Sequence, residues 1–413
     1  MLLGDKSIKP EEKLTRVYPQ KNLFSHIIGQ IDDDNNGISG LEKSLDEKLK
    51  KNKDIIQLTL DKNIQFLIRE ELLKYNQIFD TKGSAAILMD VNNGEIISLV
   101  SVPDFDPNLR ENITDVNYIN RVTKGVYEFG SVFKTFTMAA AFNEKIFEPE
   151  SEFINLPKSI TCAGFPISEY NKDIPSNLTL EQILVRSGNI GSVRIGQKIG
   201  EEKFRSFLQK IGITGTINFD IEEVGVPIKF NWGKCPLATV SFGHGITTTL
   251  LQVVKAYSII TNGGYDVNPT LIKNDEVVEK KRILDDNVTK KILPILRKIV
   301  STKDGTAKLA NVDGYEIGGK TGTANKIIDG TYSNKKVNTF VSIFPTSKPK
   351  FVLAVMLDES QNNENYIYEY RDGSNFKLKG SPRNTAGWTT VEVAGHIIDK
   401  IGPILATKYN EIN

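Results

Sequence analysis

The sequence predicts an α+β fold in which an antiparallel sheet is covered by helices. Two paired apolar runs carry this prediction. SAAILMDVNNGEIISLVSV (84–102) is divided by Asn92-Asn93-Gly94, and in 337–358 VNTFVSIF is joined to KFVLAVMLD by PTSKP. Asparagine and glycine accept the positive φ angles of a hairpin turn, so the first pair indicates two antiparallel strands, and the short connection PTSKP predicts a second hairpin. Helical patterns lie between the hairpins and after the second one, an order typical of α+β domains.

The segment before the first hairpin, residues 1–56, is polar, lysine-rich and irregular, with one helical candidate in GLEKSLDEKLK. Its stretch DDDNNGISG (32–40) predicts a surface loop, because the twelfth position of a calcium loop would be Lys43 instead of glutamate. QLTL (57–60) alternates as a short strand. Asp61 then stands where a helix N-cap is expected, ahead of apolar residues at helical spacing.

Further helices are predicted after the first hairpin. A buried helix is expected over 131–145, directly after Gly130, and its apolar residues include Phe133 and Phe136. Pro294 predicts a kink in a later helix. The remaining helical patterns cover 179–199, 201–211, 287–300 and the closing segment TTVEVAGHIIDKIGPIL.

The composition describes an ordinary soluble globular protein. A chain of 413 residues has room for roughly two domains, and its 39% apolar and 25% charged residues exclude a disordered chain. The formal charge of +1 gives no general attraction to nucleic acid, so no such partner is expected. No apolar run reaches the ~18 residues that a membrane helix needs. The N-terminal MLLGDKSIKPEEKL is not expected to be a signal peptide, because its apolar stretch is too short.

Neither a metal nor another cofactor is expected. The chain has two cysteines, Cys162 and Cys235, and three histidines, His26, His244 and His396. A zinc site needs three or four ligands brought together, and these residues do not show metal-ligand spacing. We interpret the cysteines as structural thiols, and the sequence leaves open whether they pair.

The stretch GYEIGGKTGTA (314–324) allows two interpretations. Gly314 and Gly319-Lys320-Thr321 match a phosphate-binding loop, and KFVLAVMLDES could supply an acidic strand that ends in Asp358-Glu359. Such a loop must follow a buried strand and open a helix. Here AKLANVD precedes it, and GTANKIIDGTYSNKK, with its glycines and a turn, follows. A nucleotide-binding protein is therefore only a remote alternative.

The second interpretation is a serine enzyme that attacks amides, which carries S-x-x-K, S-x-N and K-T-G in that order. Ser131-Val132-Phe133-Lys134 opens the expected buried helix, Ser187-Gly188-Asn189 follows, and Lys320-Thr321-Gly322 is the only K-T-G. Three other S-x-x-K matches, at Ser333, Ser347 and Ser374, lie in turn-like, lysine-rich stretches. Residues i and i+3 of a helix share a face, so the lysine can take the serine proton if burial and a second cation lower its pKa. Lys320 is the candidate for that second cation.

The whole chain resembles a class B penicillin-binding protein, a peptidoglycan D,D-transpeptidase, and is most similar to the septal, cell-division type. The resemblance rests on the three motifs and on the segments GEIISLVSVPDFDPN, YEFGSVFKTFTMAAA, SFGHGITTTLLQVVKAYSIITNGG, GGKTGTA and TAGWTT. RVYPQKNLFSHIIGQIDDDNNGISGLEKSLDEKL resembles the end of the family's non-catalytic pedestal. Phe129 stands where proline is common, and Gly188 where serine is common.

The resemblance implies a role for each motif residue. Ser131 would attack the carbonyl between the two terminal D-alanines of a stem peptide and form an acyl-enzyme, while Lys134 takes its proton. Ser187 and Asn189 would pass protons and orient the peptide, and Lys320 would tune the field. The remaining implied roles are substrate binding by Thr321, Gly322 and Thr323, and an oxyanion hole made by the backbone N–H groups of Ser131 and Thr323. β-Lactams would acylate Ser131.

The same resemblance implies a domain division and a setting. Residues 1–82 would be the pedestal remnant, 83–405 the transpeptidase domain of the penicillin-binding-protein and serine β-lactamase fold, and 406–413 a tail. The expected partners are peptidoglycan stem peptides, β-lactams, a membrane polymerase of the lipid-linked sugar (lipid II) and other division proteins. The domain would lie on the outer face of the cytoplasmic membrane, anchored in the full-length protein by an N-terminal helix absent from this chain.

Two alternatives share the fold: a β-lactam sensor and a β-lactamase. A sensor would bind penicillin but lack a pedestal. A class A β-lactamase needs a glutamate that holds the deacylating water between S-x-N and K-T-G. The acids in that region, Glu201, Glu202, Glu222 and Glu223, do not stand in a convincing pattern.

Overall fold

The computed structural model describes residues 15–51, 55–109, 118–274 and 280–409. The stretch MLLGDKSIKPEEKL, in which we expected no signal peptide, lies outside the described residues. The α-helices are α1 (Ser25–Ile28), α2 (Gly40–Ser44), α3 (Asp46–Lys51), α4 (Lys62–Ile78), α5 (Phe133–Asn143), α6 (Leu180–Val185), α7 (Asn189–Ile199), α8 (Glu201–Lys210), α9 (Lys234–Val240), α10 (Leu250–Thr261), α11 (Asp286–Ser301) and α12 (Thr390–Lys408). Within the described ranges, no helix is long and apolar enough to cross a membrane.

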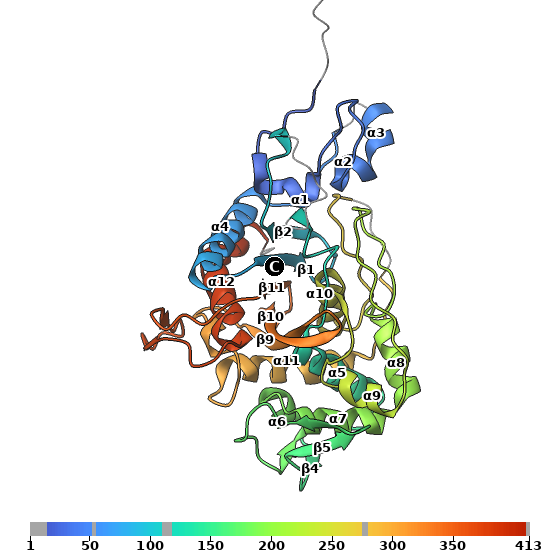
Figure 1. Cartoon of the computed structure of the whole chain (residues 1–413), viewed down its shortest axis with the longest axis vertical. Helices are drawn as coiled ribbons and strands as arrows, with labels where there is room; N and C mark the ends of the chain where they lie inside the picture. The colour runs from blue at the N-terminus through green and yellow to red at the C-terminus, as the bar shows by residue number, and fades with distance from the viewer. Residues whose placement is uncertain (1–14, 52–54, 110–117, 275–279, 410–413) are drawn as a thin grey trace, which may run out of the picture.

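The strands pair antiparallel throughout the main sheet. The strands of the main sheet and of the smaller sheets together are β1 (Gly83–Asp90), β2 (Ile96–Val102), β3 (Val126–Tyr127), β4 (Glu152–Phe153), β5 (Ser159–Cys162), β6 (Phe165–Ser168), β7 (Leu178–Thr179), β8 (Thr248–Thr249), β9 (Gly318–Ile328), β10 (Thr331–Phe344), β11 (Phe351–Asp358), β12 (Ile367–Glu369) and β13 (Lys377–Lys379). The main sheet has the order β2-β1-β11-β10-β9 (Figure 1). Both predicted hairpins, β1–β2 and β10–β11, are confirmed, and so is the α+β fold class.

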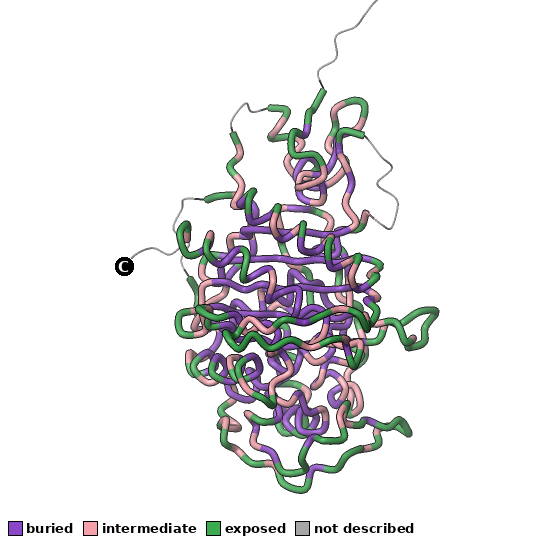
Figure 2. Tube along the Cα trace, turned by 90° about the vertical axis from the view of Figure 1, so that its left-hand side faces the viewer, coloured by how far each residue is buried: buried purple, intermediate pink, exposed green. Residues whose placement is uncertain are grey.

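Helices cover the sheet on both sides. α4 and α12 pack against each other and against the sheet, and α10 and α11 form a second contacting pair. In Figure 1, α4 and α12 lie to the left of the sheet and α10 to its right. β1, β2 and β11 are buried along their whole length, which explains their nearly continuous apolar sequences. Figure 2 shows the buried chain concentrated across the middle of the molecule.

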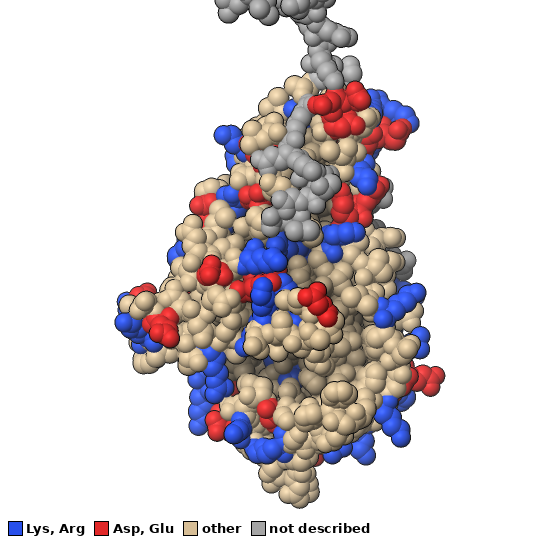
Figure 3. Space-filling model, viewed as in Figure 1, with Lys and Arg blue, Asp and Glu red and all other residues tan. Residues whose placement is uncertain are grey.

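Three shorter parts surround this core. Residues 15–51 carry α1 to α3 at the top of Figure 1, and a lobe with α6 to α9 and the small strands β4 and β5 lies at the bottom. α4 falls in the segment 1–82 that we assigned to the pedestal, yet it packs on β2 and α12 and therefore covers the sheet. Lysines and arginines are interspersed with acidic residues over the face in Figure 3.

Several local predictions are confirmed. The side chain of Asp61 caps α4 by accepting hydrogen bonds from the N–H groups of Asn63 and Ile64. DDDNNGISG is a loop, in which the Asp32 carboxylate accepts from the N–H groups of Asp34 and Asn36. The predicted helix 131–145 is α5 preceded by a 3-10 turn, η4 (Gly130–Val132). α8, α11 and α12 lie where helices were predicted.

Three predictions are wrong in detail. QLTL is no full strand: among the described residues it forms a single isolated bridge, from Leu58 to Ile272, because its backbone pairs with 271–273 through only two hydrogen bonds, Thr59 N to Leu271 O and Lys273 N to Gln57 O. GLEKSLDEKLK forms α2 and α3, interrupted at Leu45, where φ −112° and ψ 13° leave the helical region. Residues 179–199 form α6 and α7, separated at 186–188, where Ser187 has a left-handed backbone conformation.

Candidate active site

The first motif lies where the sheet edge meets helix α5. Ser131 is half-buried on the 3-10 turn that opens the helix, and Lys134 lies one turn later, fully buried. Tyr257 holds this turn in place: its hydroxyl donates to Val132 O at 3.2 Å and lies 2.8 Å from Thr135 Oγ1, from which it can accept. Among the described residues, the Ser131 hydroxyl makes no side-chain hydrogen bond, so it is available to a substrate.

The second motif occupies the break between α6 and α7. Ser187 has φ +58°, a left-handed conformation that a helix cannot continue through without steric cost. The chain therefore leaves α6, turns at Ser187 and starts α7 at Asn189. Helical propensity did not reveal this turn, but the turn places both Ser187 and Asn189 toward Lys134.

The three motifs meet in one hydrogen-bond network. Lys134 Nζ donates to Ser187 O at 2.5 Å, Ser187 Oγ at 3.1 Å and Asn189 Oδ1 at 2.7 Å. Lys320 Nζ donates to the same Ser187 Oγ at 3.0 Å and to Thr321 O at 3.0 Å. Ser187 Oγ is thus a bridge between the two lysines, through which a proton can pass from one to the other.

Burial sets the protonation of both lysines. It lowers the pKa of Lys134 to about 7, although the charge of Glu169 acts in the opposite direction. Burial, helped by the neighbouring charge of Lys134, holds the pKa of Lys320 well below its ordinary value. We had expected burial and the charge of Lys320 to lower the Lys134 pKa together; burial is the cause that lowers it, and Lys320 does not contribute. With a pKa of about 7, a substantial share of Lys134 is neutral near neutral pH, and this share can act as a base.

The third motif lies on the edge strand β9, directly against the turn that carries Ser131. A Cβ built on Gly322 would stand 2.1 Å from Phe129 O and 2.7 Å from Val132 Cγ2. On the other side of the contact, Gly130 has φ +53°, and its Cβ would stand 2.7 Å from Thr323 O and 3.5 Å from Thr323 N. The glycine of K-T-G therefore admits the nucleophile turn, whereas we had assigned it to substrate approach.

The two threonines of this strand have partners on other segments. Thr321 Oγ1 and Thr306 Oγ1 are 2.7 Å apart, and Thr323 Oγ1 accepts a hydrogen bond from Ala386 N at 3.0 Å. Ala386 belongs to TAGWTT, so this segment supports the end of β9 that faces the nucleophile turn. The binding of a carboxylate by Thr321 and Thr323 stays a prediction.

The structure contradicts the phosphate-loop interpretation. Residues 318–328 form a strand, where a phosphate loop would open a helix. Lys320 is fully buried and bonded to Ser187, and the Asp358 carboxylate accepts from Lys326 at 2.7 Å. Neither group is therefore placed to hold a nucleotide or its magnesium ion.

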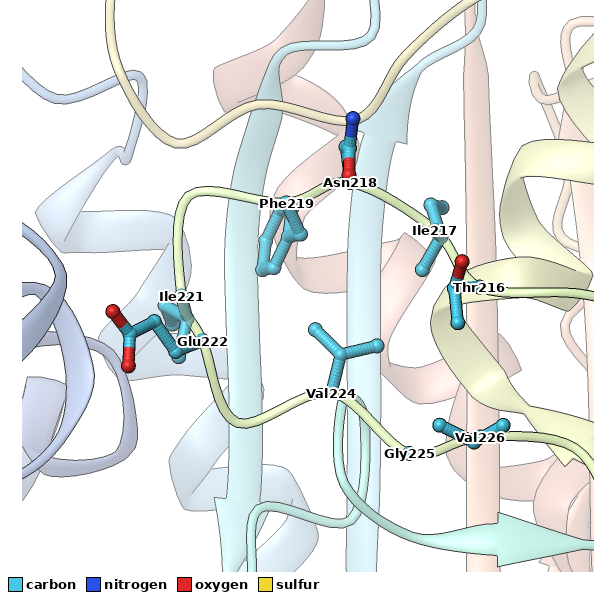
Figure 4. A pocket seen from close by; sticks show the side chains of 9 residues that line it. All are labelled: Thr216, Ile217, Asn218, Phe219, Ile221, Glu222, Val224, Gly225 and Val226. Carbon is cyan, nitrogen blue, oxygen red and sulfur yellow. The ribbon is translucent and has the colours of Figure 1, made fainter.

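The glutamates considered for a deacylating water lie elsewhere. Glu223 Oε1 accepts from Gly40 N at 3.1 Å, and Glu222 N donates to Ser44 Oγ at 3.1 Å. Glu201 and Glu202 lie in the first turn of α8. The loop that carries Glu222 surrounds a pocket of about 320 Å³, shown in Figure 4, which is lined by residues of 216–226 only and includes none of the motif residues.

One neighbour of the network was missed by the sequence analysis. Glu169 follows β6 and bonds the first backbone N–H groups of α7, beside Asn189. A single acid in a loop carries no motif. The available signal was indirect: Gly188 at the N-cap of α7 has no side chain, so the helix start needs a partner from another segment.

Comparison with known proteins identifies the family of the chain. The family model "Penicillin binding protein transpeptidase domain" matches residues 84–373, which is most of the chain. The chain belongs to this family. It is 28% identical to the probable peptidoglycan D,D-transpeptidase FtsI of Caulobacter vibrioides, over 98% of this chain and 69% of that protein. The identity to the probable peptidoglycan D,D-transpeptidase PenA of Neisseria meningitidis is 30%, over 86% of this chain and 66% of that protein.

The fold has solved counterparts. Penicillin-binding protein 3 of Mycobacterium tuberculosis, solved in complex with aztreonam, superposes with a TM-score of 0.79 at 24% identity, covering 94% of this chain and 90% of that one. This similarity shows the transpeptidase fold. The chain spans about two thirds of the length of the FtsI and PenA relatives.

Proposed function

We propose that this chain is a serine D,D-transpeptidase that cross-links peptidoglycan stem peptides during cell division. One observation carries the proposal. Lys134, on the helix that Ser131 opens, shares Ser187 Oγ with Lys320, so the S-x-x-K, S-x-N and K-T-G motifs form a single buried network beside an accessible serine. A serine followed on the same helix by a lysine with a lowered pKa is one arrangement that can perform acyl transfer.

The proposed reaction has two halves. Ser131 Oγ attacks the carbonyl carbon between the terminal D-alanines while neutral Lys134 takes the hydroxyl proton. The oxyanion is held by the N–H groups of Ser131, on the 3-10 turn, and of Thr323, on β9, two segments that approach closely at the two glycines. Such a donor is typically worth ~2.7–4 kcal/mol. The C–N bond then breaks, and the leaving D-alanine receives a proton through Lys134, Ser187 and Lys320.

The second half consumes the acyl-enzyme. An amine from a neighbouring stem peptide attacks the ester carbonyl, its proton passes to the same network, and Ser131 is released with the cross-link formed. Water in place of the amine would give a D-Ala-D-Ala carboxypeptidase side activity. β-Lactams, which imitate the terminal D-Ala-D-Ala, would stop at the acyl-enzyme on Ser131.

The setting is part of the proposal. We expect residues 83–405 to act outside the cytoplasmic membrane, together with a membrane polymerase of the lipid-linked sugar and other division proteins. The Cys162–Cys235 disulfide supports this placement, because disulfides persist in oxidising compartments. Residues 1–82 would contribute the end of the pedestal, while α4 within that segment covers the catalytic sheet.

D-alanine release tests the function. The protein would be incubated with a stem pentapeptide that ends in D-Ala-D-Ala and with an amine acceptor, and both D-alanine and the cross-linked product would be quantified. Ser131→Ala should abolish both signals. Ser333→Ala, which removes the serine of another S-x-x-K match on β10, should keep both. Equal activity of Ser131→Ala and the parent protein would refute the proposal.

A further inference from the structure

An exposed hairpin lies against the catalytic lobe. It comprises residues 159–169, with strands β5 and β6 followed by Glu169, and we call it the 159–169 hairpin. Apart from Ile167, its strand side chains are exposed or only half-buried, so the hairpin has almost no core of its own. It is attached to the lobe where β6 contacts α7 and where Cys162 is disulfide-bonded to Cys235 on α9. Figure 1 shows β5 beside α7 at the lower end of the molecule.

The first consequence concerns the start of α7. Glu169 Oε2 accepts from Asn189 N at 2.6 Å, and Oε1 accepts from Ile190 N at 3.0 Å. The N-cap residue, Gly188, makes no side-chain cap. Because the first N–H groups of a helix lack intrahelical acceptors and carry partial positive charge, a carboxylate in this position both satisfies and stabilises them.

The second consequence concerns the side chain of Asn189. Its Nδ2 donates to Ser168 O at 2.8 Å, and its Oδ1 accepts from Lys134 Nζ at 2.7 Å. A carbonyl oxygen can only accept a hydrogen bond, so Ser168 forces the amide nitrogen toward the hairpin. The oxygen must then face Lys134. The hairpin thus fixes both the backbone and the amide orientation of the S-x-N asparagine.

We infer that Glu169 is a positioning residue of the active site, held in place by the disulfide-tethered 159–169 hairpin, and that it fixes Asn189 and through it the environment of Lys134. The inference rests on the proposed transpeptidase function. A direct chemical role for Glu169 as a hydrolytic base is less suited to the geometry, because both of its carboxylate oxygens already accept backbone N–H groups.

The disulfide explains how so small a hairpin holds its place. Cys162 at the end of β5 is linked to Cys235, and α9, which carries Cys235, packs on α7. The hairpin and the helix that it caps are therefore attached to the same support. Reduction would remove the covalent link and leave the hairpin held by noncovalent contacts, chiefly those to α7.

The charge of Glu169 also acts on the base. It raises the pKa of Lys134, whereas burial lowers it by more, and the resulting pKa is about 7. The other charged or titratable groups around the pair are Lys320 on β9, and Tyr170, Arg186 and Arg383 on the side of Glu169. Removal of the carboxylate charge should therefore lower the Lys134 pKa, and the proton-free base should persist to lower pH.

The test measures acylation by a fluorescent penicillin between pH 5.5 and 9 for the parent protein, Glu169→Gln, Glu169→Asp and Glu152→Gln. Glu152, an exposed acid on β4 in the same lobe, is the matched control for loss of one charge. We expect Glu169→Gln to acylate on the order of 10- to 100-fold more slowly at its plateau, the cost of a slightly misplaced catalytic group. The rising limb of its acylation rate plotted against pH should move to lower pH. Glu169→Asp should recover part of the rate and the parent midpoint, and Glu152→Gln should match the parent.

Different results separate the possible failures. If the parent is labelled on Ser131 but Glu169→Gln has the parent rate and midpoint, the inference is overturned while the proposed function stands. If the parent is not labelled, the proposed function itself fails. A second measurement covers a Glu169→Gln protein that does not fold: the reduced parent should acylate several-fold more slowly than the oxidised parent. The Cys162→Ser/Cys235→Ser double variant should not respond to the reductant. Equal acylation rates for the reduced and the oxidised parent protein would overturn the inference that the disulfide holds the hairpin in place.

Discussion

The contact between Gly322 and the nucleophile turn provides a sharp test of the site geometry. An alanine methyl at residue 322 would stand 2.1 Å from Phe129 O, 2.7 Å from Val132 Cγ2 and 3.2 Å from Val132 N. Two of these three neighbours are backbone atoms, which cannot rotate away. Ordinary van der Waals contact begins at about 3.4 Å, so β9 and the turn must separate by at least about 1 Å.

The expected magnitude follows from that displacement. The N–H groups of Ser131 and Thr323 lie on the two sides that would move apart, so the proposed oxyanion hole would widen. A misplacement of about 1 Å costs roughly 100-fold in rate, and overpacking costs about 1–3 kcal/mol of stability. We therefore expect Gly322→Ala to acylate with penicillin on the order of 100-fold more slowly, with a measurable loss of Tm.

Gly330→Ala is the matched control. Gly330 lies in the β9–β10 turn with φ +77° and has nothing within 4 Å of its built Cβ, so alanine there strains the backbone by about 1–2 kcal/mol without reaching the site. The assay is stopped-flow or gel-based acylation by a fluorescent penicillin, alongside thermal unfolding. Gly322→Ala with the acylation rate of Gly330→Ala would refute the reasoning that the glycine brings the two sides of the site together.

Two further predictions concern Lys134 and the support of the site. Lys134 must be neutral to accept the Ser131 proton, and its pKa is about 7, so the acylation rate should rise with pH through a midpoint near 7 and level off above it; a flat profile from pH 5.5 to 9 would contradict this role. Arg371 Nη2 and the fully buried Glu392 Oε1 form an ion pair at 2.9 Å, and the loss of one partner of such a pair costs about 3–5 kcal/mol. Arg371→Ala should therefore lower the free energy of unfolding by that amount in urea titration, and an unchanged unfolding midpoint would contradict the burial argument.

Much of the fold could be predicted because local sequence and final structure agree. The Asn-Asn-Gly turn and its apolar flanks predicted β1–β2, and the Asp61 cap predicted the start of α4. These features depend on residues that are near neighbours in the chain. QLTL failed because its pattern fits a strand, whereas its backbone pairs with 271–273 over too short a stretch, and that distant segment is supplied only by the tertiary fold.

In the candidate site, too, local motifs revealed some residues, whereas the role of others depends on the tertiary fold. The order of the three motifs identified Ser131, Lys134 and Lys320, because each motif is local. The left-handed turn at Ser187 could not be predicted from propensity, since serine in a helical stretch gives no sign of a positive φ. Glu169 was equally hidden, because its role depends on a hairpin being held against α7 by a disulfide whose pairing the sequence left open.

The most direct test of the account is the position of the covalent adduct. The parent protein would be treated with penicillin, digested and mapped by mass spectrometry, with Ser131→Ala and Ser333→Ala treated in parallel. The account predicts one adduct, on the peptide that contains Ser131, present in Ser333→Ala and absent in Ser131→Ala. An adduct on another peptide, or one that persists in Ser131→Ala, would contradict the assignment of Ser131 as the nucleophile.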